Sequence, residues 1–143
     1  LNLTGQGVVD FGCGSGILAV AALLLGADRV LATDTDPQAL SATWANSERN
    51  GVAAGRLSVL HPDDLSGTET ADTVVANILT GPLCELAPQL CAMLSTPEAT
   101  LILSGILEEQ VAQVRRSYPL DLAVADRRDG WVVMQGRRGN LND

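Results

Sequence analysis

The sequence predicts a doubly wound α/β domain with a mostly parallel β-sheet and helices on both faces. Strand-like and helix-like segments alternate along the whole chain, which is typical of parallel strands joined by helical crossovers. The chain has 143 residues, of which 46% are hydrophobic and 18% charged. This length and composition suffice for one globular domain over residues 1–143 with its own core.

The first half of the chain predicts three buried strands and two helices. The strands are expected at residues 7–11, 29–33 and 57–60. An apolar run at residues 17–25 predicts the first helix, which Gly26 ends. Asp36 and Pro37 form a helix start with a capping residue and a proline in the first turn. That second helix is expected to stop at residues 50–51, an Asn-Gly pair typical of helix ends.

The second half predicts four more strands, the last two forming an antiparallel pair. These strands are expected at residues 72–77, 100–104, 120–125 and 131–135. A helical segment at residues 82–94 should be kinked or split by Pro88, which removes an internal hydrogen bond. The next helix carries Glu108 and Glu109 in its first turn, and Pro119 closes it. The expected total is seven strands.

Charge and cysteine content exclude several classes of protein. Seventeen acidic and nine basic residues give a net charge of −8, so direct nucleic-acid binding is not expected. The cysteines, Cys13, Cys84 and Cys91, are odd in number and lack metal-ligand spacing, which predicts a reducing cytoplasm and no metal. The longest apolar run has nine residues, whereas a membrane helix needs about 20. We therefore expect no membrane association.

The strongest local signal is a glycine-rich turn between the first strand and the first helix. Asp10 lies near the end of the strand, and Gly12, Gly14 and Gly16 follow at alternate positions. Glycines there permit positive φ and let a ligand approach the backbone. A dinucleotide site would need its third glycine at Ile17, so the spacing disfavours NAD. The alternative is a tight turn without a ligand.

A second acidic residue is expected beside this turn. Asp34 ends the second strand, 22 positions after Gly12, and adjacent parallel strands end at the same edge of a sheet. A carboxylate there can accept hydrogen bonds from both hydroxyls of a ribose. The alternative is a solvated carboxylate at a strand end, beside the helix cap Asp36.

These motifs resemble a known superfamily and one family within it. The segments at residues 10–19 and 34–37 look like the S-adenosylmethionine site of class I methyltransferases. Residues 75–83 and 103–107, together with Trp131 ahead of Gly136 and Arg137, resemble the methyltransferases of ribosomal large-subunit protein eleven, the PrmA family. The resemblance covers nearly the whole chain. It implies a seven-stranded Rossmann-like sheet whose last strand is antiparallel.

The resemblance also implies roles for the acidic residues. S-adenosyl-L-methionine is the implied cofactor, with the glycine turn facing its methionine part and Asp10 holding its amino group. Asp34 would bind the ribose diol. Asp63 and Asp64 follow the third strand, in the region that contacts adenine; the choice between them stays open, and a solvated acidic loop is the alternative.

Asn77 is the candidate catalytic residue. It ends the fourth strand, where related amine and amide methyltransferases carry an Asn-Pro-Pro motif, but Ile78 and Leu79 follow it here. Its amide oxygen can accept a hydrogen bond from the target amine and orient the nitrogen lone pair. The alternative is a strand-end residue that satisfies local backbone. His61 is expected in a loop that edges the adenine pocket.

Taken together, the sequence predicts an S-adenosylmethionine-dependent N-methyltransferase acting on lysine side chains and the N-terminal amine of a ribosomal large-subunit protein. The alternatives are a methyltransferase of the same fold acting on RNA or a small molecule, and a cofactor-binding module without catalysis. The family's upstream recognition domain has no counterpart in this sequence, so we expect a domain from a longer chain. Trp44 and Trp131 are expected to be packing residues.

Overall fold

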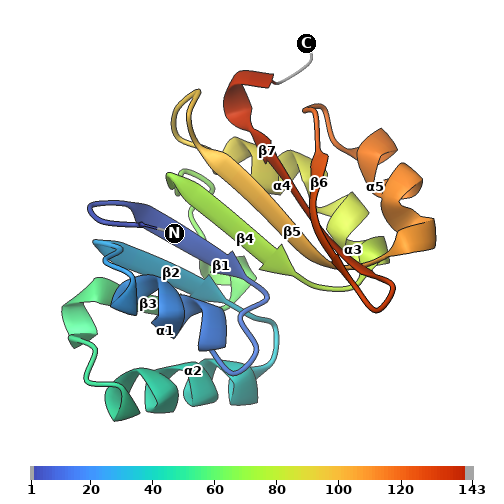
Figure 1. The fold of residues 1–143 in the computed structure, drawn as a ribbon. Helices are drawn as coiled ribbons and strands as arrows, with labels where there is room; N and C mark the ends of the chain where they lie inside the picture. The colour runs from blue at the N-terminus through green and yellow to red at the C-terminus, as the bar shows by residue number, and fades with distance from the viewer. Residues whose placement is uncertain (1, 141–143) are drawn as a thin grey trace. The chain divides into compact units, whose positions relative to one another are not determined.

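A computed structural model describes residues 2–140 of the chain. The chain divides into two compact units, the first ending at Ala71 and the second beginning at Asp72. Each unit contains part of the strand set and its own helices (Figure 1).

The first unit contains three parallel strands in the order β3-β2-β1, with two helices on one face of them (Figure 1). Its elements are β1 (Gly7–Phe11), α1 (Ile17–Leu24), β2 (Arg29–Thr33), α2 (Pro37–Arg49), η1 (Ala54–Arg56), β3 (Leu57–Leu60) and η2 (Pro62–Asp64). The core forms where Val8, Val30 and Leu57 from the strands meet Ala19 and Leu23 from α1. Burial of these side chains fixes the helices against the sheet.

The second unit contains four strands in the order β4-β5-β7-β6. Its elements are β4 (Thr73–Asn77), α3 (Thr80–Glu85), α4 (Ala87–Ala92), β5 (Thr100–Leu107), η3 (Glu108–Gln110), α5 (Val111–Ser117), β6 (Ala123–Arg128), β7 (Trp131–Arg137) and η4 (Arg138–Asn140). β4 and β5 are parallel, whereas β7 runs antiparallel to both β5 and β6. α3 and α4 lie behind β4 and β5 in Figure 1.

The predicted fold class is confirmed, with seven strands in residues 2–140 and an antiparallel last strand. β1, β2 and β3 match their expected bounds, and α2 begins as expected, because the Asp36 side chain accepts a hydrogen bond of 2.9 Å from the Gln38 N–H. The expected split at Pro88 is also confirmed, because Pro88 lies in the first turn of a separate helix, α4.

Three expected boundaries in the second unit are wrong. β5 continues to Leu107 instead of ending at Ser104, through a β-bulge. Glu108 and Glu109 lie in η3 and not in the first turn of α5. β6 begins at Ala123, later than expected. The two strand boundaries depend on pairing with β7, which sequence periodicity does not encode.

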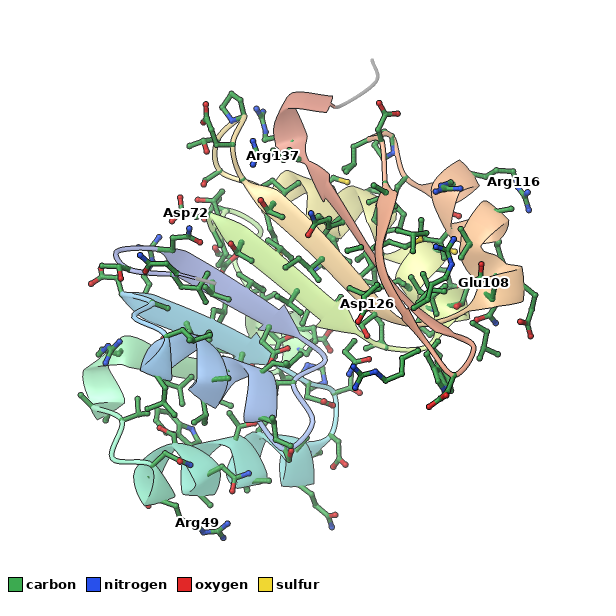
Figure 2. All side chains as sticks on the ribbon, viewed as in Figure 1. Arg49, Asp72, Glu108, Arg116, Asp126 and Arg137 are labelled. Atoms are coloured by element: carbon green, nitrogen blue, oxygen red, sulfur yellow. The ribbon has the colours of Figure 1, made fainter. Side chains whose placement is uncertain are left out.

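Charged side chains lie on the surfaces of both units. In Figure 2, Arg49 points away from α2, and Arg116 points outward from α5. Within residues 2–140, no helix is long and apolar enough to cross a membrane.

Candidate functional site

The candidate residues of the first unit gather where its three parallel strands end. The glycine turn follows β1, Asp34 follows β2, and η2 follows β3. Phe11 pairs with Thr33, and Thr33 pairs with Leu60, so the three segments leave the sheet at the same edge. The carboxyl edge of a parallel sheet is where α/β folds bind ligands.

The glycine turn is closed by backbone hydrogen bonds to the end of β2. The N–H groups of Gly12 and Cys13 both donate to the Thr33 carbonyl at 2.8 Å. Gly16 has a φ of +86°, and a Cβ on it would lie 2.8 Å from the Thr43 backbone. A residue other than glycine would therefore be strained and would also push the turn away from α2.

Helix α2 holds this turn through two side chains one helical turn apart. The Thr43 hydroxyl donates to the Gly14 carbonyl at 3.2 Å, and the Asn46 amide donates to the Ser15 carbonyl at 2.6 Å. Thr43 also contacts the sulfur of the buried Cys13 at 3.3 Å. Sequence reasoning missed these two positioning residues. The available signal was a pair of polar residues three positions apart in a helix that follows a glycine turn.

Asp10 is a buried carboxylate without a partner. Its exposed fraction is 1%, and neither carboxylate oxygen has a hydrogen-bond partner in the described part of the chain. Burial raises the pKa of Asp10 from 3.8 to about 6. The Ala19 backbone N–H, which lies near the carboxylate but outside hydrogen-bond geometry, lowers this pKa in part, and the Asp34 charge raises it. An unpaired buried carboxylate is unfavourable, so this position suits a ligand that brings a cation or N–H donors.

Asp34 links the end of β2 to the glycine turn. Its Oδ2 accepts a hydrogen bond of 2.9 Å from the Gly14 N–H, and its Oδ1 accepts one of 3.0 Å from the Asp36 N–H. A carboxylate has about four acceptor positions, so capacity for further donors remains. The side chain is partly exposed and is therefore accessible to a ligand.

Asp63 and Asp64 lie in η2, and both are exposed. His61 caps this short helix, because its Nδ1 accepts a hydrogen bond of 3.0 Å from the Asp63 N–H. The imidazole and the Asp63 carboxylate are 3.6 Å apart. This local pairing does not choose between Asp63 and Asp64 as the adenine contact.

The second unit contains a pocket of about 420 Å³ where β4 ends beside the bulge of β5. Its lining residues are Asn77, Ile78, Leu79, Ser104, Gly105 and Trp131. Trp44 is 37% exposed, so most of its surface is buried, which is compatible with the expected packing role. Trp131 is 50% exposed and lines this pocket, so the same expectation for Trp131 is wrong. Trp131 instead forms part of the pocket that contains Asn77, a role that sequence reasoning missed.

A second cavity, of about 430 Å³, lies elsewhere in the first unit. It is lined by the first residues of β1 and β2, such as Val8 and Arg29, and by Glu69. It contains none of the candidate residues, which occupy the opposite ends of these strands. Across the described residues, no group of three His, Cys, Asp or Glu side chains could hold a metal ion.

The strand arrangement and the glycine turn define a class I methyltransferase fold. The ribosomal protein L11 methylase of Lactobacillus delbrueckii subsp. bulgaricus has this structure with a TM-score of 0.84 and 31% identity, over 94% of this chain and 71% of that chain. A magnesium protoporphyrin IX methyltransferase from Synechocystis, solved with bound SAM, matches with a TM-score of 0.72 and 18% identity, over 96% of this chain and 72% of that chain. This second likeness shows the fold alone.

The family follows from the sequence. A curated relative from Pseudomonas paraeruginosa, a ribosomal protein L11 methyltransferase, is 53% identical over 139 residues, which is 96% of this chain and 47% of the relative. The family model for ribosomal protein L11 methyltransferase (PrmA) matches residues 1–139. The chain therefore belongs to the PrmA family, as the sequence predicted. It spans about half the length of the curated relatives it matches.

Proposed function

We propose that this chain is the catalytic part of an S-adenosylmethionine-dependent N-methyltransferase that modifies amino groups of ribosomal protein L11. The observation that carries the proposal is the buried, unpartnered carboxylate of Asp10 beside the glycine turn. Family membership over residues 1–139 supports the substrate class. The cytoplasm is the compartment we propose, and the free cysteines are consistent with it.

The residues of the first unit fit this cofactor. The amino group of its methionine part would supply the donors that Asp10 lacks. Nothing in the described protein lies within 4 Å of a Cβ built on Gly14, which leaves room for a ligand against the backbone there. The free acceptor positions of Asp34 would take the ribose hydroxyls, and Asp63 or Asp64 would contact the adenine.

Asn77 is proposed to orient the acceptor amine. When bound, S-adenosylmethionine would supply an activated methyl group on a sulfonium, which a neutral amine would take with its lone pair while the S–C bonding electrons stay on sulfur. The methylated amine would then lose its extra proton to solvent. Within residues 2–140, the Asn77 amide makes no side-chain hydrogen bond, so its oxygen is available to the amine N–H. Such alignment lowers the barrier without added acid–base chemistry.

The charge of the chain supports a basic protein substrate over a polyanion. At a net charge of −8, the chain would attract a basic ribosomal protein by electrostatic steering and repel RNA. The rival function with RNA as substrate is therefore not favoured. The other alternative, a module that binds the cofactor without catalysis, would share this site and would be distinguished from an enzyme only by an activity assay.

The test is methylation of purified ribosomal protein L11 with radiolabelled cofactor, comparing wild type with Asn77→Ala. We expect a fall in kcat of about 100-fold, the scale of a lost alignment, with cofactor affinity by calorimetry unchanged within about twofold. The chain contains no lysine, so every labelled methyl-lysine belongs to the substrate. Cofactor binding without transfer to any amine would identify a non-catalytic module, and equal kcat for both proteins would remove Asn77 from the mechanism.

A further inference from the structure

The pocket of the second unit is lined by both polar and apolar side chains. Asn77 and Ser104 supply an amide and a hydroxyl, neither of which has a side-chain hydrogen bond in the described residues. Leu79 and Trp131 supply the apolar surface, and they are 73% and 50% exposed. No charged side chain lines the pocket. Exposed large apolar residues grouped around free polar groups are typical of a ligand site.

Gly105, which lines the pocket with Asn77, lies in a backbone segment of unusual conformation. Ser104 and Gly105 form a β-bulge, because β5 pairs with β7 at Leu103 and again at Ile106 with a shift in register. Gly105 has a φ of +81°, and a Cβ there would lie 2.7 Å from the Ile78 carbonyl oxygen and 3.1 Å from Asn77 Oδ1. Only glycine leaves these two acceptor oxygens accessible.

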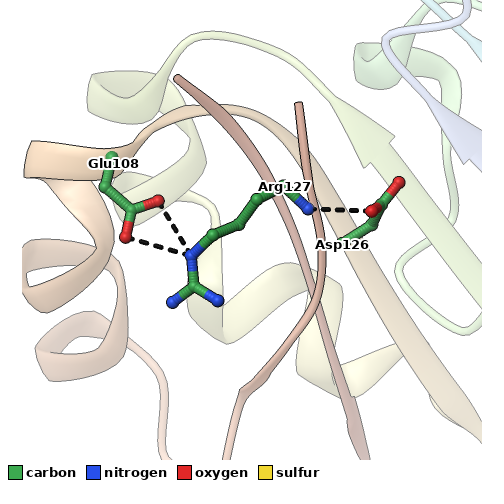
Figure 3. A network of polar contacts seen from close by, with 3 residues as sticks. All are labelled: Glu108, Asp126 and Arg127. Atoms are coloured by element: carbon green, nitrogen blue, oxygen red, sulfur yellow. Dashed lines mark hydrogen bonds and ion pairs between the residues drawn. The ribbon is translucent and has the colours of Figure 1, made fainter. Parts of the chain in front are cut away.

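Trp131 is the first residue of β7 and directly follows the turn of the β6–β7 hairpin. Asp129 and Gly130 both have positive φ, 53° and 84°, as a two-residue type I′ turn requires. The Glu108 N–H donates to the Gly130 carbonyl at 2.9 Å. Figure 3 shows the second attachment, in which Arg127 Nε donates to both Glu108 oxygens at 3.1 Å. The backbone that carries Trp131 is therefore held in position by these contacts.

We propose that Trp131 is a specificity-determining residue of the acceptor site, where its indole and Leu79 hold the aliphatic stem and ammonium of an alkylamine. This inference rests on the proposed function. Acceptor oxygens suit N–H donors, apolar walls suit methylene groups, and an indole face attracts a cation, most of all a methylated ammonium. An anionic group would find no positive side chain among the lining residues. A nucleobase could stack on the indole, but its phosphates would meet the acidic net charge of the chain.

A binding experiment follows from the tryptophan content, since Trp44 and Trp131 are the only two in the chain. In the Trp44→Phe protein, the fluorescence comes from Trp131 alone. We expect a saturable change on titration with Nα-acetyl-lysine amide, a larger one with its trimethylated form, and little with the uncharged norleucine analogue. A response to AMP that exceeds the response to both amines would replace the amine proposal with base stacking. No response to either amine would also overturn it.

A kinetic experiment separates this inference from the proposed function. With a lysine peptide as acceptor, Trp131→Ala should raise KM by about 2- to 30-fold, the range of a lost cation–π contact. Trp131→Phe should recover most of this loss, since a ring remains, whereas the matched control Trp44→Ala should leave KM unchanged. Cofactor affinity should be equal in all four proteins. If the wild type methylates the peptide and Trp131→Ala has the same KM, this inference is wrong and the proposed function stands. If the protein binds the amine but methylates nothing, the proposed function is wrong and the amine-binding role of Trp131 stands.

Discussion

The glycine turn of the first unit and the Asn77 pocket of the second differ in whether their polar groups have hydrogen-bond partners within the protein. In the turn, the Gly14 N–H donates to Asp34, the Gly14 carbonyl accepts from Thr43, and the Ser15 carbonyl accepts from Asn46. In the pocket, Asn77 and Ser104 have no side-chain hydrogen bonds among the described residues.

This difference indicates two kinds of binding site. A turn tied by several hydrogen bonds is pre-organised, so a ligand meets a fixed backbone and binding costs little ordering. Free amide and hydroxyl groups lose little when they exchange water for a ligand that brings its own donors. Substitutions in the turn should therefore change stability and cofactor affinity together, whereas substitutions in the pocket should change turnover or KM without changing stability.

The largest effect is expected for Gly14→Val. Gly14 has a φ of +55°, which strains a valine, but the space around its Cβ position is open, so we expect a folded protein of reduced stability. The branched side chain would occupy the space proposed for the cofactor. Calorimetry should detect no cofactor binding. Gly51→Val is the matched control, because Gly51 also has a positive φ, +68°, and open space. Equal binding by both variants would show that Gly14 is only a turn residue.

The next effect concerns Asp10 and pH. Because the folded-state pKa of about 6 lies above the usual 3.8, the folded protein binds more protons than the unfolded chain between these values. Stability without cofactor should then fall as pH rises through about 6, by a total of about 3 kcal/mol at 1.36 kcal/mol per pKa unit. Asp10→Asn should lose this dependence and be the more stable protein at pH 8. Urea unfolding from pH 4 to 8 measures the unfolding free energy of both proteins as a function of pH. Parallel curves would contradict the raised pKa of Asp10.

Cofactor affinity should show the opposite trend in wild type. The proposed ammonium contact needs the ionised carboxylate, so binding should tighten as pH rises from 5 to 7 and should release a proton near pH 6. Calorimetry in two buffers of different ionisation enthalpy measures that proton. Asp10→Asn should bind weakly at every pH, and a pH-dependent gain in this variant would assign the proton to another group.

Asp34→Ala should weaken cofactor binding by about 1.5–3 kcal/mol, or about 10- to 150-fold, because hydrogen bonds to a charged group are lost. The variant also removes the acceptor of the Gly14 N–H, so Asp34→Asn serves as the control that retains one acceptor oxygen. A cofactor analogue without ribose hydroxyls should bind wild type and Asp34→Ala about equally. A persistent gap with this analogue would give Asp34 a role in shaping the turn alone.

The sequence predicted most of the fold because the first unit follows local rules. Alternating buried strands, the Asp36 cap and the glycine turn each have a signal within a few residues, and β1, β2 and β3 appear at their expected bounds. The bulge at Ser104 and Gly105 has no such signal, because it depends on pairing between β5 and β7, distant in the chain. The same bulge extends β5 beyond its expected end.

The candidate site was predictable to a similar degree. Asp10, the three glycines and Asp34 lie around one turn because adjacent parallel strands end together, a rule that needs only the strand order. The supports at Thr43 and Asn46 depend on how α2 packs, and the place of Trp131 in the Asn77 pocket depends on the register of β7. The functional roles of all these residues stay predictions until variants are measured.

Thr43→Val, a nearly isosteric change, tests the glycine turn, whose backbone is held by hydrogen bonds from α2. It removes the hydroxyl that donates to the Gly14 carbonyl at 3.2 Å in a fully buried position, where one hydrogen bond contributes about 1 kcal/mol. Unfolding free energy should fall by about that amount, and cofactor affinity should fall several-fold, because the turn loses one of its supports. Unchanged affinity with reduced stability would mean that the turn keeps its shape without α2.

The smallest effect is expected for Ser104→Ala in the pocket. Its hydroxyl has no side-chain partner in residues 2–140, so its removal breaks no bond of the free protein, and stability should stay within about 0.5 kcal/mol of wild type. Cofactor affinity should also be unchanged, whereas turnover on a lysine peptide should fall if the hydroxyl accepts from the bound amine. Denaturant unfolding and kinetics on the same preparation measure all three quantities. A stability loss as large as that of Thr43→Val would show that the pocket's polar groups also stabilise the free protein. The distinction between a pre-organised cofactor turn and an acceptor pocket with free polar groups would then be wrong.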